Sequence, residues 1–447
     1  MSQPGTAPLQ APDSSVASIA GSARKASRAV AQLSADVRNE VLLAVAGAME
    51  ANAGKILEAN ERDCRTAGSE VAAGKMTNAM LARLHITERG VAQMAAQIRE
   101  VARLDDPLGR RLSAMELDDG LVLYKESCPF GVIGVIFESR PDALPQLASL
   151  ALKSGNAILL KGGAEAAHTN EAMVAVWRES LSKFPSVPAD SINLLQSRAD
   201  VKEMLSLDRD VDLIIPRGSY ALVQFIMAHS KIPVLGHSEG ICHVYIDRDA
   251  DIEKAIGISY DAKVQYPAVC NAAETLLVHE AIAPKFLPRM VAKLKEAQVE
   301  LRGDEQTLGL LPDHGIVAAT EQDWATEYSD LILALKIVAD LDEAIEHINR
   351  FGSRHTDAIV TEDLDAARRF LNEVDAAGVF HNASTRFADG YRYGLGAEVG
   401  ISTSKLHARG PMGLEGLTSY KYKLLGNGHT VGPYAKGEKK FKHRPIR

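Results

Sequence analysis

Cys270 is the residue of this chain with the clearest potential for covalent chemistry. It lies in the segment VQYPAVCNAAETLLVH, after a proline-containing loop and just before a β-rich run. A thiolate attacks carbonyl carbon readily and leaves again readily, so a cysteine in this place could act as a nucleophile. An isolated cysteine is more often a small buried apolar residue, and we favour that interpretation for Cys64, Cys128 and Cys242. The four cysteines show neither CxxC spacing nor a spacing suited to zinc.

Turns that follow two expected strands offer places for a nucleotide. The run NAILLK ends in Lys161, which Gly162 and Gly163 follow at once, and the run VDLIIP leads to Gly218 and Ser219 before an expected helix. Backbone N–H groups at the carboxyl edge of a parallel sheet or at a helix start favour phosphate. For either turn alone a purely structural role is equally compatible with the sequence, and the chain has no GxGxxG fingerprint.

Two polar segments could contact a charged ligand. The loop NRFGSRHTD contains Arg354, His355, Thr356 and Asp357 between an expected helix and an expected strand. The segment GHSEGICH offers His237, Glu239 and His243 for acid–base chemistry or substrate contacts. A hydrogen-bonded surface loop and structural histidines are the plainer interpretations. No HExxH or other metal-ligand spacing occurs, so we expect no metal site.

The elements that must position these residues change character along the chain. Residues 1–13 are typical of a short disordered leader, and residues 16–103 are rich in helix formers without strand-like alternation, which predicts helices. Two β-type runs then flank Asp118, Asp119 and Gly120, which is a hairpin turn signal. A late run, GLTSYKYKLL, could pair with this arm or with a neighbouring subunit.

Strand-like and helix-like segments alternate in two further blocks. The first has the strands GVIGVIF, NAILLK, SINLLQ, VDLIIP and PVLGH, with helices over 143–153, 171–184, 200–205 and 220–230. The second, over 239–377, has the strands CHVYID, AETLLVH, LILALKIV and AIVT, with helices such as 281–298 and 342–349. This alternation predicts parallel sheets covered by helices on both faces.

Bulk properties exclude several classes of protein. A chain of 447 residues predicts two or three domains, and a net charge of -8 argues against broad nucleic-acid binding. The basic tail KGEKKFKHRPIR is most simply a solvated tail, with a binding arm as the alternative. No apolar stretch approaches a membrane span and no secretory signal opens the chain, so we expect a cytoplasmic protein.

Seven segments, taken in order, resemble the aldehyde dehydrogenase superfamily and, within it, the gamma-glutamyl phosphate reductase family. They are PFGVIGVIFESRPDALPQ, KSGNAILLKGG, VDLIIPRGSYALV, GHSEGICHVYID, YPAVCNAAETLLVH, VADLDEAIEHINRFGSRHTDAIV and GLEGLTSYKYKLLGNGH. The resemblance covers nearly the whole chain. It implies an α/β fold of aldehyde dehydrogenase type, with a Rossmann-like cofactor domain (14–110 and 129–238) and an α/β catalytic domain (239–385). A β-hairpin oligomerisation arm with a C-terminal strand (111–128 and 386–447) completes it.

The resemblance also implies a reaction and residue roles. Cys270 would attack the acyl phosphate of L-glutamate 5-phosphate, and NADPH would reduce the resulting thioester to L-glutamate 5-semialdehyde, the second step of proline biosynthesis. By the same resemblance, the cofactor would be held by Lys161 with Gly162 at the ribose, by Gly218 and Ser219 at the pyrophosphate, and by Glu327 at the nicotinamide ribose. Ala164, where NAD-preferring relatives often carry a carboxylate, favours NADPH, although Glu165 lies next to it.

Several positions depart from the wider superfamily. Gly236 stands where hydrolytic members have a glutamate that activates water, which suits a reductase whose thioester must be protected from hydrolysis. Ser139 or Arg140 stands in place of the oxyanion-hole asparagine, so Arg140 with the backbone N–H of Cys270 could stabilise the oxyanion. Phe351 departs from the signature of the narrower family, which leads us to expect His or Tyr at this position.

The remaining predictions concern the substrate, the partners and the alternatives. Arg140, His355 and Asp357 have charges that match the carboxylate and ammonium of an amino acid. We expect a homo-oligomer, with contact to glutamate 5-kinase as a further possibility. An aldehyde-oxidising hydrolytic enzyme and a catalytically silent binding partner of the kinase are the competing hypotheses. Glu274 near Cys270 would oppose thiolate formation unless it points elsewhere.

Overall fold

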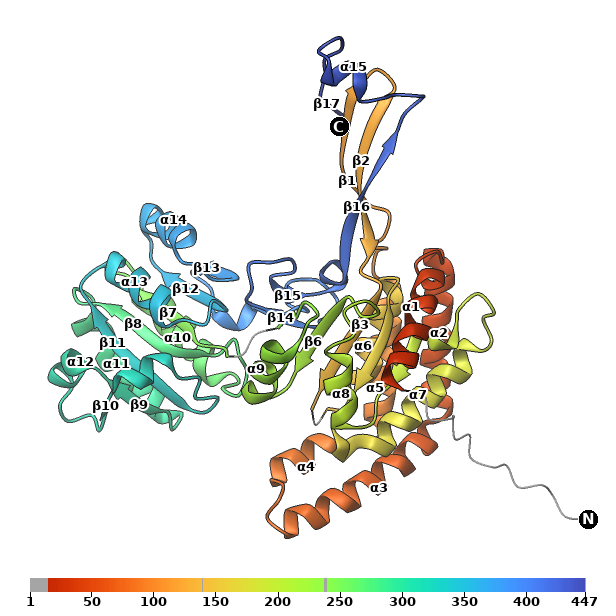
Figure 1. Ribbon diagram of the computed structural model, residues 1–447. Helices are drawn as coiled ribbons and strands as arrows, with labels where there is room; N and C mark the ends of the chain where they lie inside the picture. Colours follow the sequence, from red (N-terminus) through yellow and green to blue (C-terminus); the bar gives the residue numbers. More distant parts are fainter. Residues whose placement is uncertain (1–14, 139, 237–238, 447) are drawn as a thin grey trace, which may run out of the picture. The chain divides into compact units, whose positions relative to one another are not determined.

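The computed structural model describes residues 15–138, 140–236 and 239–446 (Figure 1). The expected leader and the candidate residues Ser139 and His237 lie outside the described residues. Contacts divide the chain into two units. Unit 1 comprises Met1–Val234 and Leu414–Arg447, and unit 2 comprises Leu235–Gly413. Residues 386–413, which we expected to lie with the arm, are thus grouped with unit 2, while the functional roles of the predicted ranges stay predictions.

The amino-terminal part of unit 1 is helical, as predicted. Its helices are α1 Val16–Val30, α2 Ala35–Ala51, α3 Ala53–Ala72, α4 Asn78–Leu84 and α5 Glu88–Arg103. Hydroxyl side chains cap four of them, because Ser15, Ser34, Thr77 and Thr87 each accept a hydrogen bond from a backbone N–H of the first turn. No helix among the described residues is long and apolar enough to cross a membrane.

A four-stranded parallel sheet forms the centre of unit 1. Its strands are β3 Val132–Phe137, β4 Ala157–Lys161, β5 Ile192–Leu194 and β6 Leu213–Arg217, in the order β5-β4-β3-β6. Its helices are α6 Ala143–Lys153, α7 Ala167–Leu181, α8 Arg198–Met204 and α9 Tyr220–His229. The strand order reverses between β3 and β6, which is where open α/β sheets bind ligands. The expected strand PVLGH is wrong for its described residues, among which only Val234 forms a bridge, to Ile214.

An arm of antiparallel strands belongs to unit 1 (Figure 1). The predicted hairpin is confirmed by β1 Arg111–Asp118 and β2 Leu121–Pro129, with Gly120 at φ 71 in the turn. The late β-like run forms β16 Thr418–Leu425, which pairs with β2. The basic tail is exposed to solvent, as expected, but it is also paired, because β17 Arg444–Ile446 pairs with β1. Helix α15 Gly432–Ala435 lies between β16 and β17 in the chain.

Unit 2 contains a seven-stranded sheet in which every described pairing is parallel. In the order β10-β9-β11-β8-β7-β12-β13 the strands are Val317–Ala318, Glu300–Gly303, Ile332–Val338, Ala273–His279, Cys242–Ile246, Thr356–Val360 and Gly378–His381. The helices are α10 Ile252–Val264, α11 Ala283–Glu296, α12 Glu305–Leu310, α13 Leu341–Phe351 and α14 Leu364–Glu373. A separate pair of strands, β14 Gly400–Ser402 and β15 Gly410–Met412, follows.

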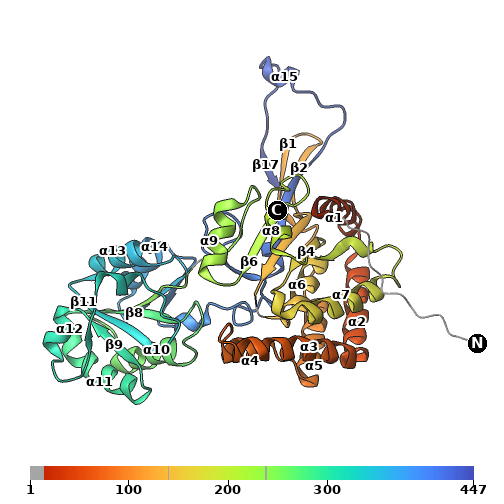
Figure 2. The same cartoon turned by 60° about the horizontal axis from the view of Figure 1, so that its bottom comes forward.

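Helices cover both faces of this sheet (Figure 2). Val244 and Leu276 pack in one core with Phe286 of α11, whereas Tyr245 packs in another with Phe370 of α14. Neighbouring residues of β7 therefore point to opposite helical layers, as a strand buried on both faces requires.

Candidate active site

Cys270 lies in the loop of residues 265–272 that joins α10 to the amino end of β8, here called the Cys270 loop. Its side chain is half-buried. The Cys242 thiol, which is buried, donates a hydrogen bond to the Cys270 carbonyl oxygen at 3.2 Å. Burial raises the pKa of Cys242 well above its ordinary value, so Cys242 stays a thiol and serves as a structural donor.

Gly240 lies directly against the Cys270 loop. A Cβ atom at Gly240 would be 2.1 Å from the Cys270 carbonyl oxygen and 2.4 Å from its Cα, distances that no side chain can adopt. The Gly240 N–H donates to the Glu327 Oε2 at 2.9 Å. Glu327, predicted from the resemblance to bind cofactor, is thereby held next to the segment that touches Cys270.

Lys263 and Glu274 bracket the Cys270 loop. Lys263 lies in the last turn of α10 and Glu274 in β8, both side chains are fully buried, and their Nζ and Oε2 atoms are 2.6 Å apart. Burial raises the pKa of the Glu274 carboxyl to about 7, against the opposing effect of Lys263. The ammonium offsets the carboxylate charge that we expected to oppose thiolate formation at Cys270, and the pair ties the two ends of the loop together.

His355 and Asp357 are both 1% exposed. The Asp357 Oδ1 accepts hydrogen bonds from the backbone N–H and from the ring Nδ1 of His243, both at 2.9 Å. The His355 Nδ1 lies 3.0 Å from the Thr356 Oγ1 and 3.8 Å from the Cys242 Sγ. These contacts favour a positioning role at the amino ends of β7 and β12, and the substrate contacts of both residues stay predictions.

In unit 1 the predicted cofactor residues gather at the carboxyl ends of β4 and β6. Lys161 ends β4, is 8% exposed, and donates from Nζ to the Gly162 carbonyl oxygen at 2.6 Å. Burial lowers its pKa, and the nearby Glu165 carboxylate acts in the opposite direction. Gly218 follows β6, where a Cβ atom would lie 2.5 Å from the Glu138 Oε2.

The start of α9 already binds a carboxylate group of the protein. The Ser219 N–H, at the N-cap of α9, donates to the Glu138 Oε2 at 2.8 Å, and no side chain of its own caps the helix. A helix start binds anions through its free N–H groups and its dipole. The Glu138 carboxylate therefore marks a position, at the reversal between β3 and β6, where a phosphate oxygen would also be stabilised.

Comparison with known proteins decides the family. Residues 5–311 match the model of the aldehyde dehydrogenase family. The gamma-glutamyl phosphate reductase of Synechococcus sp. (strain JA-3-3Ab) is 54% identical over 98% of this chain and 96% of the relative, and that of Haloquadratum walsbyi is 52% identical over 94% and 93%. The crystal structure of the Thermotoga maritima gamma-glutamyl phosphate reductase superposes with a TM-score of 0.90 at 40% identity, covering 93% of this chain and 100% of that one. The chain belongs to the gamma-glutamyl phosphate reductase family.

A gamma-glutamyl phosphate reductase needs a nicotinamide cofactor, and unit 1 has residues that fit one. Gly218 and Ser219 at the start of α9 would hold the pyrophosphate. The Ser219 N–H already donates to the Glu138 carboxylate, so this helix start can bind an anion. Lys161 would donate to the ribose beside it. These assignments rest on the resemblance and stay predictions.

Two of the departures, one from the superfamily and one from the narrower family, can be placed in the structure. Arg140 belongs to unit 1, where its carbonyl accepts from the Ala143 N–H just before α6, and its oxyanion role stays a prediction. Phe351 ends α13, and its ring packs on that of His347 with centroids 4.7 Å apart. A ring at this position is thus part of the packing around a buried histidine.

Gly240 and Lys263 are residues that sequence reasoning missed. A glycine within GHSEGICH gives no sign of its contact with Cys270, which lies 30 residues later in the chain. Lys263 resembles any other lysine in a helix, and only its complete burial against Glu274 distinguishes it.

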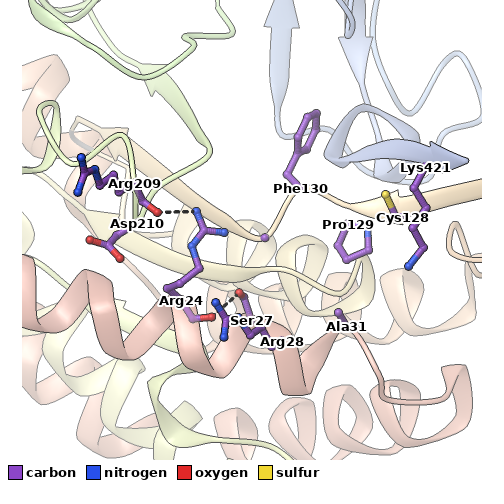
Figure 3. A pocket seen from close by; sticks show the side chains of 11 residues that line it. Arg24, Ser27, Arg28, Ala31, Cys128, Pro129, Phe130, Arg209, Asp210 and Lys421 are labelled. Atoms are coloured by element: carbon purple, nitrogen blue, oxygen red, sulfur yellow. Dashed lines mark hydrogen bonds between the residues drawn. The ribbon is translucent and has the colours of Figure 1, made fainter.

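A cavity of about 600 Å³ in unit 1 contains none of the predicted site residues (Figure 3). It is bordered by α1, the β2–β3 junction and β16, and its lining includes Arg24, Cys128 and Lys421. Figure 3 shows the Arg24 guanidinium donating to the Arg209 carbonyl oxygen, and the same guanidinium pairs with Asp212 at 2.7 Å. This cation is therefore engaged in holding the fold.

Proposed function

We propose that this chain reduces L-glutamate 5-phosphate to L-glutamate 5-semialdehyde and inorganic phosphate, with NADPH as the reductant and Cys270 as the nucleophile. The observation that carries the proposal is the Cys270 loop, a half-buried cysteine pinned by Cys242, Gly240 and the Lys263–Glu274 pair. It occurs in a chain that is 54% identical to a gamma-glutamyl phosphate reductase over 98% of its length. The reaction is the second step of proline biosynthesis.

The Cys270 thiolate attacks the acyl carbon, the C–O bond to the phosphoryl group breaks, and a thioester forms. The bound cofactor supplies the hydride that reduces this thioester. Collapse of the resulting thiohemiacetal releases the aldehyde and returns the thiolate. The backbone N–H of Cys270, with Arg140, is the proposed donor pair for the oxyanion.

We propose that the site does not activate water against the thioester. Gly236 stands at the position where hydrolytic relatives have a glutamate. Glu239, three residues later, is the nearest candidate, and burial together with the neighbouring Glu327 raises its pKa. Gly236 itself carries no carboxylate, so in this proposal a thioester that awaits hydride is protected from hydrolysis.

The cofactor preference rests on Ala164, whose small side chain leaves room for a 2′-phosphate after the β4 strand. The Glu165 carboxylate acts against this preference, because its negative charge would repel a 2′-phosphate. It lies close to Gly163, where a Cβ atom would be 2.0 Å from the Glu165 Oε1. We propose NADPH as the cofactor. A cytoplasmic location is part of the same proposal.

Oligomerisation through the arm is a further part of the proposal. Strand β16 lies at an edge of the arm sheet and exposes Tyr420, Tyr422, Leu424 and Leu425, which are 49–61% exposed. An unpaired strand edge with large exposed apolar side chains is suited to docking against a second copy. Contact with glutamate 5-kinase, which would supply the labile acyl phosphate, is a proposal that rests on chemistry alone.

The test uses the reaction in reverse. The chain should reduce NADP with L-glutamate 5-semialdehyde only when phosphate or arsenate is present to accept the acyl group. Steady reduction of NADP without either anion would instead identify a hydrolytic aldehyde dehydrogenase. No reduction by the folded chain under any of these conditions would indicate the silent binding partner.

A further inference from the structure

Arg386 is a buried cation held against the Cys270 loop. It lies in a short 3-10 helix, Thr385–Phe387, and is 7% exposed. The Thr385 Oγ1 donates to the Asn271 carbonyl oxygen at 2.7 Å, and the Asn271 Nδ2 donates to the Ala388 carbonyl oxygen at 2.8 Å. Two hydrogen bonds therefore fasten this helix to the residue that follows Cys270.

A third contact fixes the guanidinium itself. The Arg386 Nε donates to the Gln265 Oε1 at 3.0 Å, and Gln265 is the first residue of the Cys270 loop. The side chain of Arg386 thus reaches one end of the loop while its own helix is tied to the other end. Burial lowers the pKa of Arg386 and Arg392 acts in the same direction, while the Asp261 and Asp389 carboxylates and then the Cys270 thiol counteract them.

The terminal nitrogens of Arg386 have no protein partner in the described part of the chain. Its only side-chain hydrogen bond there uses Nε, and no described carboxylate forms an ion pair with it. The Asp261 and Asp389 carboxylates act on the guanidinium only from beyond ion-pair distance, so its burial is not offset by a paired counter-charge. The two Nη groups have no paired carboxylate and belong to a side chain that is fastened to the Cys270 loop, so they can receive an anion.

We propose that Arg386 binds the phosphoryl group of the acyl phosphate beside Cys270 and stabilises the phosphate as it leaves. The inference rests on the proposed function. As the S–C bond forms and the C–O bond breaks, the electron pair of that bond goes to the phosphate oxygen, and the guanidinium offsets the added charge. The planar fork of arginine suits two phosphate oxygens at once, which an ammonium cannot reproduce.

The test measures the phosphate dependence of NADP reduction by L-glutamate 5-semialdehyde in the full-length chain. In Arg386→Met the KM for phosphate should rise by about tenfold or more, as loss of charge-assisted hydrogen bonds implies, while the KM for the semialdehyde stays within about twofold. Arg386→Lys should restore part of the phosphate affinity. Arg368→Met, which removes an exposed arginine of α14 paired with Asp365, is the matched control and should behave as the native chain.

Each outcome bears on the assignment. A phosphate-dependent native enzyme whose Arg386→Met variant keeps the native KM for phosphate would overturn the phosphate subsite alone. A native chain that turns over without phosphate would overturn the proposed function and the subsite with it. If Arg386→Met fails to fold, Arg386→Lys decides, since a native KM for phosphate in that variant would exclude bidentate binding by the guanidinium.

Discussion

Gly240 leaves no room for any side chain behind Cys270. A methyl group at Gly240 would meet the Cys270 carbonyl oxygen at 2.1 Å, so the Cys270 loop would have to move. We expect Gly240→Ala to lower kcat at least about tenfold and to destabilise the fold by about 1–3 kcal/mol, as overpacking does. Steady-state kinetics and urea unfolding measure the two effects.

Gly257 offers the matched control for that substitution. It lies in α10, where a Cβ atom would have nothing within 4 Å. Gly257→Ala should keep native activity and stabilise the helix by about 0.5–1 kcal/mol. Equal activity in the two alanine variants would show that the close contact at Gly240 is not needed to hold Cys270.

The Lys263–Glu274 pair makes a second prediction at the residue scale. Lys263→Met leaves a fully buried carboxyl group without its partner, so we expect a loss of about 3–5 kcal/mol in the free energy of unfolding. Replacing both residues with Met removes the unpaired charge and should recover much of that loss. A single variant as stable as the native chain would contradict the pairing.

The raised pKa of Glu274 also determines whether the stability of the fold rises or falls with pH. Its folded-state pKa of about 7 lies above the ordinary 4.5, so the folded chain holds more protons than the unfolded chain between these values. The contribution of this carboxyl to stability is therefore complete below about pH 4.5 and is lost as the pH rises through 7. Urea midpoints of native and Glu274→Gln chains at pH 5 and pH 8 measure it, and the difference between the two chains should change with pH.

At the scale of elements, the arm owes part of its order to the C-terminal tail. β17 pairs with β1, Lys442 forms ion pairs with Asp118 and Asp119, and Tyr434 stacks on Phe441 with ring centroids 4.3 Å apart. The run of basic residues gave no sign of these partners, because the acidic groups that it meets lie more than 300 residues earlier in the chain. The partners of a basic run are therefore known only once the fold brings acidic residues next to it.

Deletion of residues 430–447 should therefore loosen the arm and little else. Without β17, the edge of β1 loses the backbone partners of Ala114, Met115 and Glu116. Hydrogen exchange followed by mass spectrometry should show faster exchange in β1 with unchanged exchange in β3 and β4. Unchanged protection of β1 would mean that β2 alone holds it.

Element prediction succeeded where the pattern was long and local. The bounds of α6 and β8 agree with the sequence expectation, and the turn at Asp118–Gly120 closes the predicted hairpin. Strands β9, β10 and β13 were not predicted, because two to four residues carry too little periodicity. They become strands only by pairing with neighbours in the sheet.

At the scale of the molecule, the exposed edge of β16 predicts how copies associate. Leu424→Glu places a charge on an apolar edge that is 55% exposed at this residue, so the mass in solution should fall toward that of one chain. Light scattering coupled to size exclusion measures it. Leu364→Glu, at a residue 67% exposed on α14, is the control, and equal masses for both variants and the native chain would exclude the arm edge as the interface.

The candidate site could be predicted only as far as its motifs extend. Cys270 and Lys161 were proposed because each lies in a segment with a recognisable pattern, and their roles stay predictions. Arg386 reaches Gln265 across 121 residues of sequence, and such a contact exists only after the sheet of unit 2 has formed. The chemistry could therefore be proposed from the motifs, whereas the residues that position Cys270 could not.

The most direct test of the central claim is a single-turnover experiment without phosphate. Mixing the chain with NADP and L-glutamate 5-semialdehyde should give a burst of one NADPH per Cys270 and then stop, because the thioester has no acceptor. Adding phosphate should start steady turnover, and Cys270→Ala should give neither phase. Continued turnover without phosphate, or a burst that survives in Cys270→Ala, would contradict an acyl-phosphate reductase that works through a Cys270 thioester.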